Sequence, residues 1–149
     1  MDLLKSAVDA VTGQLSGLWP QTPSEKPVLI DGKLRPCQWT PNCVSSESCD
    51  IVHHVDPLAF SGEPNLAWAA LKELIVREGG TIQDEQPKYL WSTFLIPVFG
   101  YIDDVEFRLA EDEGVIHVRS AARFGFYDLN VNRARVDQLR AALIMALKE

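Results

Sequence analysis

The chain has 149 residues, a net charge of −7 and an apolar fraction of 46%, which are ordinary values for one globular domain. Its 21 acidic against 14 basic side chains argue against broad binding to nucleic acids or to anionic membranes, since both need basic surface. The apolar runs are far shorter than the roughly 20 residues that cross a bilayer, so we expect no transmembrane segment.

Residues 1–27 are predicted to form an amphipathic helix and a proline-rich linker. The apolar residues of the helix recur at helical spacing: Leu4, Val8, Val11, Leu15 and Leu18. We expect this stripe to pack on its own domain or on a neighbour, because one lysine among aspartates suits a membrane surface poorly. Since no basic flank precedes a continuous apolar stretch, we expect a cytoplasmic protein. A periplasmic or thylakoid-lumen protein whose export signal has been removed is the alternative.

Residues 28–149 are predicted to form a single α+β domain. "VLIDGKL" suits a short hairpin around Asp31-Gly32, and the cysteine-rich stretch after it is predicted to be an irregular loop. A helix is expected over "EPNLAWAALKELIVREGG", ended by its two glycines. Its buried side should carry the following residues: Leu66, Ala70, Leu71, Leu74 and Ile75.

Four segments with alternating apolar residues follow, and these are typical of strands. They read "TIQDEQ", "KYLWSTFLI", "YIDDVEFRLAED" and "GVIHVRSAARF". The last segment, "NRARVDQLRAALIMALKE", returns to helical spacing. We therefore predict an antiparallel meander of about four strands, with the helix before it and the helix after it packed on one face. The other face should be at least partly exposed.

A four-residue turn at residues 111–114 sets the register of the last two strands. It places Glu106 opposite Arg119, with Asp104 on the same face, while Val105 and Phe107 point towards the helices. The pair has three possible roles. It is an exposed salt bridge, or part of a buried network that fixes the sheet to the last helix, or part of a pocket for an anionic ligand. The pocket would be formed by three arginines, Arg119, Arg123 and Arg133. The buried network would contain the same arginines together with Asp103 and Asp128.

Three separated motifs resemble, in order, the domain of unknown function 1499 family of bacteria, cyanobacteria and plastids. They are "CQWTPNCVSS", "YIDDVEFRL" and "VRSAARFGFYDLNVNRARVDQLR", and the resemblance begins at about residue 37. No shared activity is assigned to that family, so the resemblance supports the domain boundary and implies no chemistry. The chain has Ala122 where the family usually has serine, and Asn130 where it usually has glycine. Asparagine tolerates a left-handed backbone, and Asn130 or Asn132 should cap the last helix.

The cysteine stretch has several interpretations. The spacing of Cys37, Cys43 and Cys49 lacks the close pairs of zinc sites, so no metal site is expected. The leading interpretation is a rigid turn with Cys43 buried and three side chains bonded to the backbone: Asn42, Ser45 and Ser46. A Cys37–Cys43 disulfide across Pro41 is the alternative, suited to an oxidising compartment; the family pattern retains both cysteines. A catalytic Cys43 is the least supported interpretation.

Three functions compete. The first is a non-enzymatic binding or protein-interaction module, indicated by aromatic residues at the rim of the sheet and by the apolar loop "FLIPVFGYI". The second is a carrier of a small apolar or anionic, lipid-like ligand held between sheet and helices, with Arg119 or Arg123 as its anchor. The third is an enzyme that uses Cys43 or the carboxylates of residues 103, 104 and 106. No cofactor is indicated, and the oligomeric state stays open.

Overall fold

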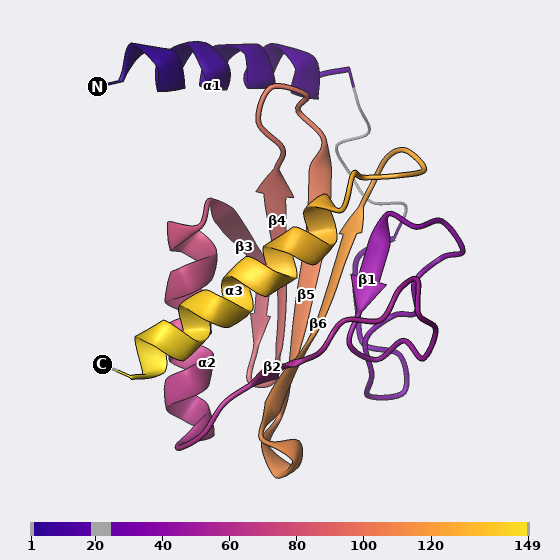
Figure 1. The fold of residues 1–149 in the computed structure, drawn as a ribbon, viewed down its shortest axis with the longest axis vertical. Helices are drawn as coiled ribbons and strands as arrows, with labels where there is room; N and C mark the ends of the chain where they lie inside the picture. The colour runs from indigo at the N-terminus through magenta and orange to yellow at the C-terminus, as the bar shows by residue number, and fades with distance from the viewer. Residues whose placement is uncertain (1, 19–24, 149) are drawn as a thin grey trace.

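An antiparallel sheet of six strands forms the centre of the domain (Figure 1). The computed structural model describes residues 2–18 and 25–148, so most of the predicted linker lies outside the described residues. The strands are β1 (Cys43–Ser45), β2 (Leu58–Ala59), β3 (Gly80–Gln86), β4 (Tyr89–Leu95), β5 (Ile102–Ala110) and β6 (Val115–Ala122). Their order is β1-β6-β5-β4-β3, and β2 pairs with β6.

The predicted four-strand meander corresponds to β3–β6, and its register is the predicted one. Glu106 lies opposite Arg119, and the turn at η1 (Glu111–Glu113) ends at Gly114 with a left-handed φ of 66°. The predicted number of strands was too low, because β1 and β2 also pair with β6. Both are very short and pair with a strand far along the chain, so neither leaves an alternating pattern that the sequence could show. Cys43 therefore lies in a strand and not in the predicted irregular loop.

Two helices, α2 (Pro64–Arg77) and α3 (Val131–Leu147), cover one face of the sheet, as predicted (Figure 1). The apolar residues of the strands on this side are buried among them, including Val105, Phe107 and Val118 at 0% exposure. Burial of such side chains contributes about 1.5–3 kcal/mol each to folding. Leu66, expected on the buried side of α2, is 65% exposed because the helix turns Ala67 and Trp68 towards the sheet.

Residues 25–37, which we call the strap, cross the other face of the sheet. Lys26 lies 4.0 Å from Asp84 on β3, and the N–H of Leu34 bonds to Glu47, which follows β1 along the chain. A disulfide then joins Cys37 at the end of the strap to Cys43 on β1. The predicted turn at residues 31–32 lies within the strap, with Ile30 bridged to Lys33. This face is therefore exposed only in part: the strap buries its centre at Glu106, whereas Thr81 at the β3 edge of the same face is exposed.

The N-terminal helix α1 (Leu3–Ser16) lies across the end of the sheet where β4 meets β5 (Figure 1). It contacts the domain through Thr12, whose hydroxyl accepts a bond from the Val98 N–H, and through Ser16 against Gly100. Gly100 has a φ of 75°, and a Cβ there would collide with the Ser16 backbone. The close approach of α1 therefore needs glycine at this position.

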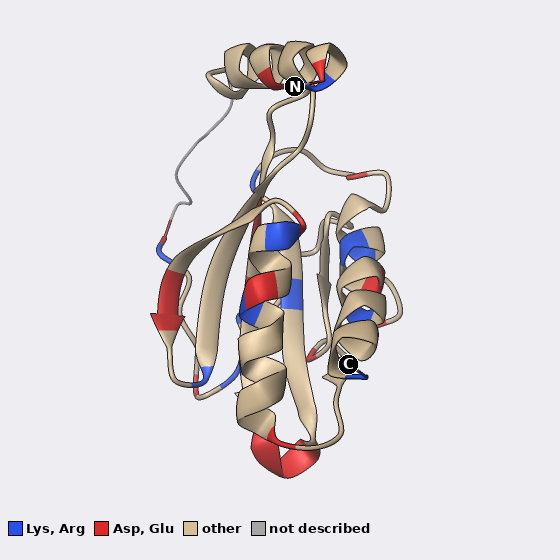
Figure 2. Ribbon diagram, turned by 90° about the vertical axis from the view of Figure 1, so that its left-hand side faces the viewer, with Lys and Arg blue, Asp and Glu red and all other residues tan. Residues whose placement is uncertain are grey.

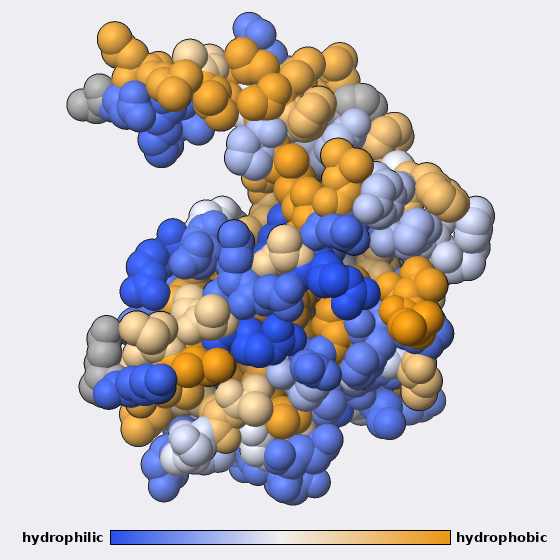
Figure 3. Space-filling model, viewed as in Figure 1, coloured by the Kyte–Doolittle hydropathy of each residue, from blue (hydrophilic) through white to orange (hydrophobic). Residues whose placement is uncertain are grey.

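Only part of the apolar stripe of α1 is covered: Val8 and Leu15 are half-buried, and the rest of the stripe is exposed. Thr12 is the buried residue of this helix, whereas Leu4 and Leu18 are 72% and 70% exposed. Figure 3 shows hydrophobic side chains along the outer side of α1 and hydrophilic ones on its underside. None of the described helices is long and apolar enough to cross a bilayer.

The disulfide yields the first prediction. Replacing Cys37 and Cys43 together by serine should lower the free energy of unfolding by about 2 kcal/mol, because the crosslink removes chain entropy from the unfolded state of a short loop. Urea unfolding of the oxidised protein measures the change. Cys49→Ser is the control, since Cys49 is exposed and outside the disulfide, and it should leave the midpoint unchanged. An unchanged midpoint in the double variant would contradict the prediction.

Candidate functional site

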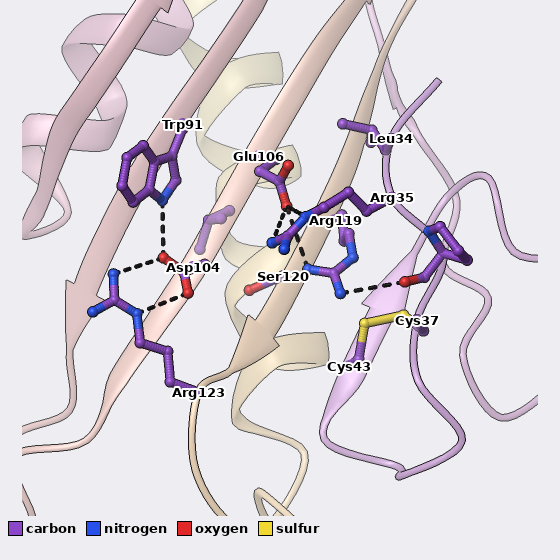
Figure 4. Close-up of polar contacts among 12 residues, drawn as sticks. Leu34, Arg35, Cys37, Cys43, Trp91, Asp104, Glu106, Arg119, Ser120 and Arg123 are labelled. Carbon is purple, nitrogen blue, oxygen red and sulfur yellow. Dashed lines mark hydrogen bonds and ion pairs between the residues drawn. A yellow bond between two sulfur atoms is a disulfide. The ribbon is translucent and has the colours of Figure 1, made fainter. Parts of the chain in front are cut away.

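Glu106 is the centre of a buried polar cluster between the sheet and the strap (Figure 4). Arg35 of the strap donates to its Oε2 from Nε and Nη2, at 3.2 and 2.9 Å. Arg119 donates to the same oxygen at 3.3 Å, and the Tyr89 hydroxyl donates to Oε1 at 2.8 Å. Glu106 is 0% exposed, so these donors replace all the water that an ionised carboxylate would otherwise hold.

The cluster binds the strap to the sheet through both of its arginines. Arg119 also donates to the carbonyl oxygen of Pro36, and it is only 6% exposed. Burial lowers the pKa of the Arg119 guanidinium, and the charge of Glu106 opposes this shift. Burial raises the pKa of the Tyr89 hydroxyl far above its ordinary value, and the charge of Glu106 adds to the rise. Tyr89 therefore remains a hydrogen-bond donor over the physiological pH range.

Two further ion pairs lie on the same face. Asp104 accepts from Arg123 at 2.8 and 2.9 Å and from the Trp91 indole at 2.8 Å (Figure 4). Arg108 donates to both oxygens of Glu47 at 3.0 and 3.1 Å. Burial opposes ionisation of Glu47, but the bonds from Arg108 and Leu34 outweigh it and hold the Glu47 pKa below its ordinary value. Each guanidinium of this face therefore has a carboxylate partner.

The three arginines predicted to share a pocket lie apart. Arg119 and Arg123 bind different carboxylates on the strap face. Arg133 is on α3, on the other side of the sheet, and donates to the carbonyl oxygens of His54 and Val52. Asp128 accepts from the backbone and the side chain of Asn132 and so caps α3. The predicted cap at Asn130 or Asn132 is thus replaced by Asp128, and Asn130 supplies the left-handed turn, with a φ of 63°.

Adjacent Asp103 and Asp104 point to opposite faces, as expected for a regular strand. Asp103 lies 2.8 Å from Arg135 of α3, which also donates to Asn132 and Ser120. Burial raises the pKa of Asp103, and the Arg135 charge opposes that shift. This arrangement links the sheet to α3. Among the described residues, no three His, Cys, Asp or Glu side chains are grouped to hold a metal ion.

The cysteine stretch is ordered by the disulfide and by backbone bonds. The Asn42 amide donates to the Gly125 carbonyl at 2.7 Å, and the Ser46 hydroxyl accepts from the Val118 N–H. The Ser45 hydroxyl accepts from the Glu47 N–H. The sulfur of Cys43 is bonded to Cys37, so the structure holds no thiol at Cys43 that could attack a substrate.

Aromatic side chains gather at the end of the sheet that lies next to α1. We call this the aromatic end and define it by six residues: Trp39, Phe99, Tyr101, Phe124, Phe126 and Tyr127. Phe99, Tyr101 and Phe124 stack in a row with ring centroids 5.9 and 5.7 Å apart. Trp39 meets Phe126 edge to face at 5.4 Å. Trp39 is nevertheless 79% exposed and Phe126 56% exposed.

Hollows of several sizes border α3, and two of them bear on the predicted functions. A groove of about 460 Å³ lies between α2, β4 and α3, and its walls include Phe94, Ile96 and Leu139, with Arg135 as its guanidinium. A smaller pocket of about 110 Å³ lies beside the aromatic end, between Pro41 and Tyr127. Neither hollow is lined by Arg119 or Arg123.

Sequence reasoning missed several residues of the strap face. Arg35 and Tyr89 complete the Glu106 cluster, and Glu47 completes the pair with Arg108, yet Arg35 and Glu47 belong to no motif or alternating segment. Arg35 and Glu106 are 71 residues apart. The position of Tyr89 in the alternating pattern of β4 was the one available signal, because it places the hydroxyl on the face that carries the charged residues.

The second prediction concerns Glu106. Glu106→Gln should cost about 3–5 kcal/mol of stability, because it leaves two largely buried guanidiniums without a countercharge. Chemical denaturation measures the loss. Glu85→Gln is the matched control, since Glu85 forms an exposed pair with Lys72 and should cost only about 0–1 kcal/mol. Similar losses in the two variants would rule out a special role for the Glu106 cluster.

The third prediction concerns alkaline pH. The folded pKa of Tyr89 is raised, so from about pH 10 the unfolded chain releases this proton while the folded protein keeps it, and stability falls as pH rises. Tyr89 should account for a loss of about 1 kcal/mol between pH 10 and pH 11. Tyr89→Phe should remove that part of the slope, although it costs about 1–3 kcal/mol below pH 10 by leaving Glu106 one donor short.

Denaturation curves at several pH values test this prediction. Tyr127→Phe, at an exposed tyrosine, should keep the wild-type slope. A Tyr89→Phe slope equal to that of the wild type would contradict the assignment.

Comparison with known proteins agrees with the resemblance noted in the sequence. No curated protein matches the chain. One family model does match, described as protein of unknown function (DUF1499), and it covers residues 33–143. The matched part runs from the strap to α3 and contains the Glu106 cluster and the whole sheet. Because the match covers well over half of the sequence, the chain belongs to the DUF1499 family.

Proposed function

We propose that the protein is a non-enzymatic protein-interaction module and that the aromatic end is its contact surface. The observation that carries the proposal is the exposure of large apolar side chains at this end. Phe99, Phe126 and Tyr127 are each more than half exposed, as is Trp39. Leu129 and Val98 extend the surface. A patch of this kind is costly to leave in water, and it is typical of a surface that a partner covers.

The charge pattern supports this surface over the others. The three segments that build it carry no charged residue: residues 37–46, 94–102 and 124–127. Figure 2 shows loops beneath α1 that are mostly without charge, whereas the hairpin at the opposite end of the sheet is acidic. A partner that covers these three segments therefore need not desolvate any charge within them. Aromatic side chains also dominate the binding energy of many protein interfaces.

A protein partner is favoured over a membrane. The net charge of −7 repels anionic lipid, and α1 carries a single lysine. Arg123, the cation nearest to the aromatic row in sequence, is paired with Asp104. A lipid surface would thus gain apolar contacts here without electrostatic attraction.

We further infer an oxidising compartment for the protein, the periplasm or the thylakoid lumen. The Cys37–Cys43 disulfide supports this inference, because such bonds persist in oxidising compartments and are rare in reducing ones. The bond also joins the two ends of the loop that carries Trp39, so it contributes to the shape of the proposed surface.

A second candidate function is a carrier of a small apolar ligand. The groove of about 460 Å³ between α2, β4 and α3 favours it, because its volume and its largely apolar walls suit a small molecule. Arg135 is the arginine that lines the groove, but Asp103 balances its charge. A neutral ligand therefore fits the groove better than an anion. Native mass spectrometry of protein purified from its own source tests this candidate. A measured mass equal to that of the chain without a ligand would rule the carrier function out.

The fourth prediction tests the interaction surface. Phe126→Ser should reduce the amount of a cross-linked partner captured from native extract at least tenfold, because loss of one central aromatic contact commonly costs a factor of ten or more. Val76→Ser is the matched control, because Val76 is similarly exposed but lies on α2. Quantitative mass spectrometry of the captured proteins measures the change, and both variants should keep the wild-type melting temperature.

Two results would contradict the proposal. One is equal capture by the wild type and Phe126→Ser. The other is co-sedimentation of the wild type, but not of Phe126→Ser, with phosphatidylcholine vesicles, since this would assign the aromatic end to a membrane.

A further inference from the structure

We propose that the pocket of about 110 Å³ beside the aromatic end receives one aliphatic side chain, of leucine size, from the protein partner. This inference rests on the proposed function and specifies what the partner must present. The pocket lies between the loop before β1 and the loop before α3, and its apolar walls are Pro41, Val44, Val52 and Tyr127. Asp128, Asn130 and Arg133 also line it.

The pocket and the aromatic end form one continuous surface. Tyr127 belongs to both, and Pro41 lies in the same disulfide-closed loop as Trp39. The bond from Asn42 to the carbonyl of Gly125 fastens this loop to the loop that carries Phe126. A partner that covers Trp39 and Phe126 would therefore also cover the mouth of the pocket.

The volume decides which kind of occupant fits. Small-molecule sites usually measure about 300–1,000 Å³, so this pocket is too small for a cofactor or a metabolite of ordinary size. At about 110 Å³ the pocket has well under half the smallest of these volumes, so it suits one side chain and not a whole ligand. The four carbons of a leucine side chain match this space. A pocket for one side chain, bordered by exposed aromatic rings, is how protein interfaces commonly hold an anchor residue.

The charged groups that line the pocket favour an uncharged occupant. Both oxygens of Asp128 are engaged, because Oδ1 accepts from the Asn130 N–H and Oδ2 accepts from Asn132. The two Nη atoms of Arg133 donate to the carbonyl oxygens of His54 and Val52. A charged side chain in the pocket would lose its bound water, and the Asp128 and Arg133 groups that could replace this water already bond to other atoms of the protein.

Arg133 acts here as a positioning residue. Its guanidinium connects α3 to residues 52–54, and so it holds Val52 as a wall of the pocket. Lysine is a poor substitute, because a point charge lacks the planar fork that reaches two carbonyls at once. The role of Arg133 is thus to shape the pocket, in contrast to the anion binding that the sequence suggested.

The fifth prediction uses capped amino acids as probes of the pocket. N-acetyl-leucine methylamide, added to the full chain with ¹³C-labelled valine methyls, should shift the Val44 and Val52 signals in a saturable way. N-acetyl-alanine methylamide should bind at least tenfold more weakly, because it lacks three buried carbon groups. N-acetyl-lysine methylamide should cause no saturable shift.

Variants separate the pocket from the aromatic end. Val52→Trp fills the pocket at a half-exposed position, so it should abolish the leucine response and reduce partner capture at least tenfold, while Val76→Trp should change neither. Arg133→Lys should weaken the leucine response through loss of the wall. Equal responses to leucine and alanine, or Val44 and Val52 signals unmoved up to the solubility limit, would overturn the inference.

The outcomes also separate this inference from the function on which it rests. If Phe126→Ser loses the partner and Val52→Trp keeps it, the interaction surface stands and the pocket is not used. If Phe126→Ser keeps the partner, the proposed function itself fails.

Discussion

The buried carboxylate of Glu106 is the constraint on which the structure depends. A charge with no exposure to water must be fully bonded, and three donors from three separate segments of the chain meet this need. Two of them, Tyr89 and Arg119, come from the neighbouring strands, so the bonds also fix the pairing of β4, β5 and β6. The third, Arg35, brings the strap over the sheet. A buried cluster of charges need not raise the net stability of the fold. Any shift of strand or strap would nevertheless leave a buried charge unpaired, and this is strongly destabilising.

The cover on both faces of the sheet is the reason why we propose the aromatic end as the contact surface. Helices α2 and α3 cover one face, and the strap covers the centre of the other. The arginines that could have bound an anion are engaged by Asp104, Glu106 and Glu47. At the aromatic end, in contrast, loops from three parts of the chain expose their rings. Loops placed by a rigid scaffold are common sites of binding, and here the buried ion pairs provide the rigidity.

The loops at this end are themselves tightly fastened. The disulfide closes the loop of Trp39, Asn42 bonds it to Gly125, and Asp128 caps α3 directly after Tyr127. Exposed aromatic residues on anchored backbone lose little conformational entropy when a partner binds. This preorganisation is consistent with a surface that recognises a partner of fixed shape.

The sequence by itself determined the elements whose signal is local. Alternation over β3–β6 and the turn at residues 111–114 specified the register that places Glu106 opposite Arg119, because a slip of one residue would bury the wrong face. Helical spacing gave α2 and α3 in the same way. Tertiary structure alone decided the strap, the two short strands and the exposure of α1. Each depends on contacts between residues far apart in the chain, and no period within a short window encodes such a contact. The site shows the same division. The sequence placed Glu106, Arg119 and Asp104 on one face of the sheet. Only the tertiary structure showed that Arg35 binds Glu106 and that Arg133 lies on the other side of the sheet.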